Sequence, residues 1–169
     1  IVDFLCTAGL VVDRAGQRFV DEGLGGVYMV NRIAALPDPL AATVIFDQAI
    51  WDGPGREFIS PANPQLVSGG ATIEKSQDLA GLCGELGLPA GSLGTVVAAY
   101  NAAVDAGATS SLLPARTAAT YKPLAIRAAP FYAVRLCAGV TYTMGGLKTD
   151  GAGRVLGAGG RLAPGAARR

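Results

Sequence analysis

The chain has 169 residues, half of them apolar, which is enough for one domain with a sizeable buried core. Its 14 basic and 13 acidic residues give a net charge of +1 and form no run of either sign, which argues against nucleic acid as a main partner. No apolar run approaches the roughly 18 residues of a membrane span, and the start lacks a signal-peptide pattern.

The first half of the chain predicts short elements separated by turns. In chain order they are two short strands around a turn within residues 9–20, a helix at 27–36, a buried strand at 43–46, a turn of helix at 47–51 and a proline-containing loop at 53–70.

The second half contains the two clearest helical patterns. The predicted elements are a short strand at 72–75, helices at 79–86 and 93–104, a polar connector at 108–123, a strand at 131–134 and a hairpin at 147–156. Ser76 is a candidate N-cap for the first of these helices. Strands at both ends and helices in the middle predict an α+β fold with a mixed or antiparallel sheet and two to four helices.

Reactive side chains are few. The chain contains no histidine, which removes Ser-His-Asp and Cys-His catalysis and the usual zinc sites. Cys6, Cys83 and Cys137 are far apart and have no metal-ligand spacing, so no metal site is expected, and reduced thiols in a cytoplasmic protein are the better interpretation. The remaining groups for proton transfer are carboxylates, Tyr, Lys, Arg and Cys.

The segment with the most site-like character is residues 130–150. A strand-like apolar run leads through Gly139 into Thr143, Met144, Gly145 and Gly146. Paired glycines allow either a sharp hairpin turn or the close approach of backbone to a flat ligand, and the spacing alone leaves both open. No G-x-G-x-x-G or phosphate-binding loop pattern is present, so this chain alone is not expected to hold a nucleotide.

Two further groups of side chains have a structural and a functional interpretation. Arg18 and Glu22, four residues apart, either form an ion pair that steadies a loop or orient a carboxylate substrate. Tyr28, Tyr132 and Tyr142 either pack their rings in the core or act as general acids.

Three separated segments together resemble a known family. GLVVDRAGQRFVDE at residues 9–22, TVVAAYN at 95–101 and the 130–150 segment, with PFYA and T-x-G-G-L-x-x-D, are similar in order and spacing to the fumarate reductase/succinate dehydrogenase flavoproteins. That family includes soluble fumarate reductases, 3-ketosteroid dehydrogenases and tricarballylate dehydrogenases. The resemblance covers about residues 8 to 156.

The resemblance implies a division of labour within a longer flavoenzyme. Residues 1–156 are expected to be the capping, or substrate, domain, and 157–169 the truncated start of the return to the FAD-binding domain or a tail. Thr143 would bind substrate, and Met144, Gly145 and Gly146 would face the flavin. FAD would bind in the full-length protein and not in this fragment, and both chain ends look like cuts.

Departures from the family pattern narrow the expected reaction. Gly26 stands where soluble fumarate reductases have their proton-donating arginine, and Val2 and Leu5 replace a Glu-x-x-Arg relay. Tyr142 replaces the histidine before T-x-G-G. The resemblance therefore implies an enzyme other than a true fumarate reductase, with Tyr142 and Tyr28 as catalytic phenols for a carbonyl-activated substrate.

The expected function is thus part of an FAD-dependent oxidoreductase that caps the flavin, with Arg18 and Glu22 at the substrate. Its partners would be the FAD-binding domain of the same polypeptide and a small-molecule substrate, without nucleic acid or membrane, and the fragment could dimerise. A non-catalytic binding module that keeps the capping fold is the alternative, and a self-contained esterase-like or lyase domain is a weaker one.

Overall fold

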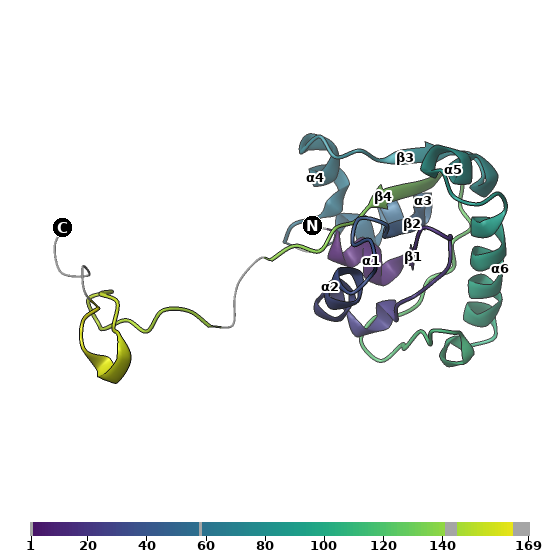
Figure 1. Cartoon of the computed structure of the whole chain (residues 1–169). Helices are drawn as coiled ribbons and strands as arrows, with labels where there is room; N and C mark the ends of the chain where they lie inside the picture. The colour runs from purple at the N-terminus through teal and green to yellow at the C-terminus, as the bar shows by residue number, and fades with distance from the viewer. Residues whose placement is uncertain (1, 58, 141–144, 164–169) are drawn as a thin grey trace. The chain divides into compact units, whose positions relative to one another are not determined.

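The computed structural model describes residues 2–57, 59–140 and 145–163 and has the expected α+β fold (Figure 1). Its helices and strands, in chain order, are α1 (Asp3–Ala8), β1 (Leu10–Val12), α2 (Gly26–Ala34), β2 (Thr43–Asp47), α3 (Gln48–Asp52), α4 (Ala62–Ser68), β3 (Glu74–Ser76), α5 (Leu79–Leu86), α6 (Ser92–Asp105) and β4 (Phe131–Arg135). The six α-helices in the described part exceed the two to four expected, because the short helices α1 and α4 carry no repeating apolar pattern.

The four strands form one antiparallel sheet in the order β1-β2-β4-β3. Ile45 of β2 pairs with Leu10 of β1 on one side and with Ala133 of β4 on the other. Every residue of β2 is buried, because β2 is central and both α1 and α3 pack against it. The buried strand predicted at residues 43–46 is thereby confirmed.

Three aromatic rings stack inside the core beside this sheet. Phe46, Trp51 and Tyr132 have ring centroids 5.5 to 5.8 Å apart. The Tyr132 hydroxyl donates a hydrogen bond to the side chain of Gln48. Tyr132 therefore has the packing role that was one of its two interpretations.

Side-chain carboxylates cap the starts of α3 and α5. The Asp47 carboxylate accepts from Ile50 N at the start of α3 and from Arg127 N, at 2.6 Å, in the segment before β4. Asp78, rather than Ser76, caps α5, because its carboxylate accepts from Gly81 N at 2.6 Å. The N-cap prediction for Ser76 was wrong by two residues.

The chain divides into two compact units, residues 1–138 and 139–169. In the second unit, Thr149 pairs with Val155 in a single antiparallel bridge, and Asp150 accepts hydrogen bonds from Ala152 N and Arg154 N. The hairpin expected at 147–156 thus forms around Asp150. The predicted limit of the capping domain, between residues 156 and 157, differs from the boundary between the two compact units at 138 and 139. This domain limit stays a prediction.

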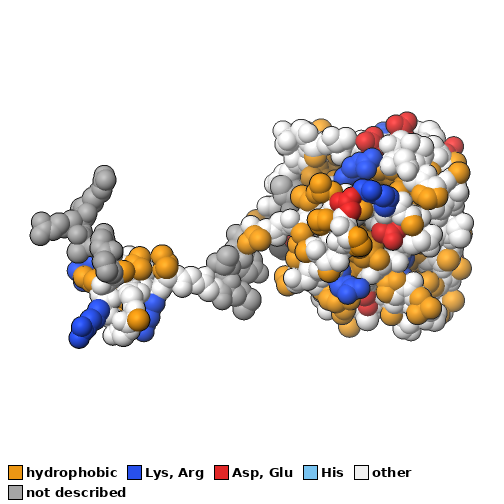
Figure 2. All heavy atoms as spheres, viewed as in Figure 1, with side chains coloured by type: hydrophobic (Ala, Val, Ile, Leu, Met, Phe, Trp, Pro, Cys, Tyr) orange, Lys and Arg blue, Asp and Glu red, His pale blue; other side chains and the backbone are white. Residues whose placement is uncertain are grey.

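Charged side chains do not gather by sign on the face drawn in Figure 2, where basic and acidic groups of the first unit lie among hydrophobic ones. The longest described helix, α6, has 14 residues. None of the described helices combines the length and hydropathy needed to cross a membrane.

Candidate active site

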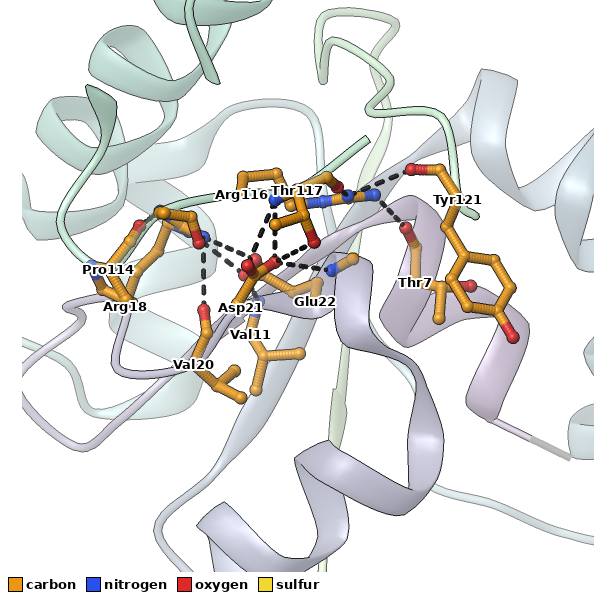
Figure 3. Close-up of polar contacts among 12 residues, drawn as sticks. Thr7, Val11, Arg18, Val20, Asp21, Glu22, Pro114, Arg116, Thr117 and Tyr121 are labelled. Carbon is orange, nitrogen blue, oxygen red and sulfur yellow. Dashed lines mark hydrogen bonds and ion pairs between the residues drawn. The ribbon is translucent and has the colours of Figure 1, made fainter. Parts of the chain in front are cut away.

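A buried polar cluster joins the loop after β1 to the long segment between α6 and β4. We define it by Arg18, Asp21, Glu22 and Arg116, all at most 8% exposed (Figure 3). Two guanidinium groups and two carboxylates balance in charge. Such a cluster is stable only when each buried charge has close polar partners.

Glu22 is the acceptor at the centre of the cluster. Its Oε2 accepts from Arg18 Nη2 at 2.6 Å and its Oε1 from Arg18 Nε at 3.1 Å, a two-point contact. Oε1 also accepts from the backbone N–H of Val11, at 3.0 Å. Because β1 is an edge strand, Glu22 supplies an acceptor that a further strand would otherwise provide.

Arg18 extends the contact to a segment almost a hundred residues away. Its Nη1 donates to the carbonyl of Pro114 at 2.6 Å, and its Nη2 donates to that of Val20 at 3.2 Å. The guanidinium carbon lies 5.7 Å from the ring centre of Tyr100, within reach of a cation–π contact. Burial raises the pKa of the Tyr100 phenol, and the nearby Arg116 guanidinium opposes this rise.

Asp21 ties the same two segments together through backbone groups. Its Oδ1 accepts from Gly23 N at 2.9 Å and from Thr117 N at 3.0 Å. Gly23 is packed so closely here that a Cβ would stand 1.9 Å from the carbonyl oxygen of Thr117. The glycine after the Asp-Glu pair is therefore required by packing within the chain.

Arg116 is fully buried and holds three carbonyl groups. Its Nη2 donates to Thr7 O of α1 at 2.8 Å, and its Nη1 donates to Tyr121 O at 3.0 Å and to Thr117 O. Thr7 and Tyr121 both line a surface cleft. The buried polar cluster thus positions the walls of that cleft.

The cleft has a volume of about 290 Å³ and lies between the first turns of α1 and α2. The described residues that line it are Asp3, Phe4, Thr7, Gly26, Val27, Ser60 and Tyr121.

Two aromatic rings and one glycine are among the residues that line the cleft. Phe4 and Tyr121 meet edge to face, with ring centroids 6.4 Å apart. Opposite the start of α2, a Cβ on Gly26 would stand 3.0 Å from the carboxylate carbon of Asp3. The absence of a side chain at residue 26 therefore leaves room for the Asp3 carboxylate.

A buried thiol lies in α1, the helix that also supplies Asp3, Phe4 and Thr7 to the cleft. Cys6 of α1 is 4% exposed, and burial raises the pKa of its thiol far above the ordinary value of 9.0. A thiol with a raised pKa is a poor nucleophile at neutral pH. Within the described ranges, no group of three or more acidic or cysteine side chains converges as a metal site would require.

The residues predicted for the site fall into different places. Arg18 and Glu22 lie inside the buried polar cluster and point at internal partners, which is the geometry of the loop-steadying ion pair. Tyr28 is exposed on α2. It follows the cleft residue Val27 in the chain but does not itself line the cleft. Gly145 and Gly146 are exposed in the second unit.

The remaining three predicted residues, Tyr142, Thr143 and Met144, lie outside the described residues. Their roles stay predictions.

Sequence reasoning missed three residues that build the cleft and its support, Asp3, Arg116 and Tyr121. Asp3 lies in a helix too short for a periodic pattern, and the other two belong to the segment described only as a polar connector. No local signal marks Arg116 as buried, because its partners come from residue 7 and from its own loop.

The α+β fold of this chain is also found in flavin-dependent enzymes. The protein-family model described as "FAD binding domain" matches residues 3–165. The chain therefore belongs to the FAD binding domain family. This agrees with the flavoprotein family to which the sequence motifs point, although the match does not separate a capping part from a cofactor-binding part.

Individual relatives fit the same family. A curated relative, NADH:acrylate oxidoreductase of Vibrio harveyi, is 30% identical over 154 residues, which are 91% of this chain and 14% of the relative. The chain thus spans about a seventh of that relative's length.

Solved structures share the fold. An open conformation of a flavocytochrome c3 fumarate reductase has a TM-score of 0.70 at 22% identity, over 94% of this chain and 26% of that one. The 3-ketosteroid Δ4-(5α)-dehydrogenase of Rhodococcus jostii RHA1 gives 0.61 at 23%, over 94% and 31%. The 3-ketosteroid Δ1-dehydrogenase of Sterolibacterium denitrificans gives 0.63 at 25%, over 95% and 32%.

Proposed function

We propose that this chain is the capping part of an FAD-dependent oxidoreductase and that its cleft forms one half of the substrate site. All strand pairs of the described sheet are antiparallel. A dinucleotide-binding unit is instead built on parallel strands joined by a crossover helix, with a glycine-rich turn at the cofactor. The architecture of the described residues therefore favours the capping role over cofactor binding.

The observation that carries this proposal is the position of the cleft beside an exposed apolar rim. Leu24, Val27 and Tyr28 are 52%, 71% and 38% exposed and follow the buried polar cluster directly. Exposed apolar groups around a cleft are typical of a surface that another domain covers. The FAD-binding domain of the same polypeptide is the proposed partner, and closure against it would exclude water from the reaction.

Gly145 and Gly146 are the residues that would face the flavin in this proposal. A Cβ on either glycine would meet nothing within 4 Å among the described atoms, and neither has a positive φ. Packing and backbone conformation therefore do not require glycine there, whereas a flat ring approaching the backbone would. Met144 would lie at the same ring, and Thr143 would bind the substrate. Bound FAD supplies the acceptor or donor of a hydride.

The proposed chemistry uses phenols in place of the usual arginine and histidine. Tyr142 and Tyr28 would polarise the substrate carbonyl and carry the proton that accompanies the hydride. The name of the Vibrio harveyi relative, which contains acrylate, supports a small carbonyl-activated alkene as substrate. Arg18 and Glu22 would act on the substrate only if they exchanged their present internal partners.

The proposal includes the domain limits. Residues 1–156 would form the capping domain and 157–169 the start of the return to the FAD-binding domain, in a protein of the cytoplasm. Alone, the fragment would be inactive and could dimerise through the apolar rim. A stand-alone binding module with this fold is the alternative.

The experiment is steady-state turnover of the flavoprotein that contains this chain, with Tyr142→Phe and Tyr28→Phe. We expect kcat to fall by about a hundredfold or more for Tyr142→Phe, the size of a lost general acid, with flavin content unchanged. Tyr132→Phe, which removes a core hydroxyl, is the matched control and should keep kcat. Unchanged turnover in Tyr142→Phe removes that residue from the mechanism.

A further inference from the structure

We propose that Asp3 determines substrate specificity in the cleft, by accepting a hydrogen bond from an ammonium, ring N–H or hydroxyl group of the substrate. This inference rests on the proposed function, because it names the class of molecule that the same cleft takes. The substrate would have a flat, unsaturated skeleton, and a second carboxylate at the Asp3 end would be disfavoured.

The charge of the cleft is negative. Asp3 is the one charged side chain among the described residues that line it. Its carboxylate has no hydrogen-bond or ion-pair partner among the described residues. The two arginines of the buried polar cluster bind other groups. Arg18 and Arg116 are both buried and donate to Glu22 and to backbone carbonyls.

Gly26 leaves space for this carboxylate. The Asp3 carboxylate stands against bare backbone, since a Cβ on residue 26 would lie 3.0 Å from both Cγ and Oδ1. Residue 26 lies at the first turn of α2 and has no positive φ, so its backbone conformation does not require glycine. The glycine therefore lets the carboxylate occupy the mouth of the cleft.

Two aromatic rings line the cleft beside Asp3. Phe4 and Tyr121 hold each other edge to face, and Arg116 fixes the backbone of Tyr121. Rigid rings beside one carboxylate suit a flat molecule that has a donor group at one end. A dicarboxylate would instead place a second negative charge near the exposed Asp3 carboxylate, and the two like charges would repel each other.

The test compares four probes that share a but-2-enoate skeleton and differ at carbon 4: 4-aminocrotonate, 4-hydroxycrotonate, crotonate and fumarate. Their dissociation constants are measured by calorimetric titration of the flavoprotein that contains this chain. The variants are Asp3→Asn, which removes the charge, and Gly26→Ala, whose Cβ would stand 3.0 Å from the carboxylate and push against it. Glu85→Gln, an exposed charge change on α5, is the matched control.

The expected order for the parent is 4-aminocrotonate tightest and fumarate weakest. Asp3→Asn should weaken 4-aminocrotonate by about tenfold to a hundredfold, the size of a charged hydrogen bond, and strengthen fumarate. Gly26→Ala should change the order in the same direction, and Glu85→Gln should leave it unchanged.

The proposal is overturned if fumarate binds the parent most tightly, if no probe binds, or if Asp3→Asn keeps the parent's order. Flavin content and melting temperature are measured in parallel for every variant. Loss of flavin from the parent would count against the proposed function, whereas an unmoved probe order with flavin present counts against Asp3 alone.

Discussion

Replacing Glu22 by Gln should destabilise the first compact unit severely. The substitution keeps the shape of the side chain and an acceptor for Val11 N but removes the negative charge that balances Arg18. Both side chains are at most 4% exposed, and their contacts are 2.6 and 3.1 Å long. Breaking a buried ion pair by neutralising one partner costs about 3–5 kcal/mol, because the other charge stays buried.

The assay is urea unfolding of the 169-residue chain followed by far-ultraviolet circular dichroism. Asp52→Asn is the matched control, since Asp52 and Arg56 form an ion pair with the same four-residue spacing but with side chains 49% and 58% exposed. Its unfolding midpoint should stay at the parent's value. A loss below about 1 kcal/mol in Glu22→Gln, as for a surface pair, would refute the buried cluster.

A double-mutant cycle gives the coupling directly. Arg18→Met alone should also destabilise, because the carbonyls of Pro114 and Val20 lose their donor. Arg18→Met combined with Glu22→Gln should cost less than the sum of the two single changes, because neither charge is then left alone. Strict additivity would show that the two side chains do not interact in solution.

Three further substitutions have outcomes fixed by local geometry. Cys6→Ala should reduce the loss of unfolding free energy at alkaline pH. Below pH 9 the thiol is protonated in the folded and unfolded states, but above pH 9 only the thiol of the unfolded chain ionises. The parent therefore loses about 1.4 kcal/mol of unfolding free energy per pH unit, and the variant does not. Equal slopes between pH 9 and 10.5 in urea titrations would contradict this. Asn101→Ala should cost about 2–3 kcal/mol, since the amide donates to Ile126 O and accepts from Ile126 N, both at 2.8 Å, and an unchanged urea midpoint would count against these bonds. Gly23→Ala should lower the melting temperature by several degrees, as its Cβ would overlap Thr117 O, and a melting temperature equal to the parent's would mean that the two loops are farther apart.

The elements best predicted from the sequence are those whose pattern repeats. The helix predicted at 93–104 is α6, and Leu93, Val97 and Tyr100 are buried as its spacing requires. The helix α4 was missed within a segment described as a loop. Pro64 fits there because it lies in the first turn of the helix. The backbone N–H groups of a first turn have no partner within the helix, so a proline there costs no helical hydrogen bond.

The candidate site was predictable only in its local parts. The spacing of Arg18 and Glu22 predicted their contact, but their burial depends on Pro114, which the fold brings from 96 residues away. Asp3 and Tyr121 share a cleft although the chain between them contains most of the fold. Local sequence patterns do not indicate which distant segments come into contact, so these contacts could not be predicted from the segments one by one.

The most direct test of the capping role is flavin binding by two proteins, the flavoprotein that contains this chain and the 169-residue chain alone. Each is titrated with FAD, and bound flavin is measured by absorbance after gel filtration. We predict one FAD per molecule in the flavoprotein and none retained by the 169-residue chain. Tight, stoichiometric FAD binding by the chain alone would contradict it and would assign cofactor binding to this domain.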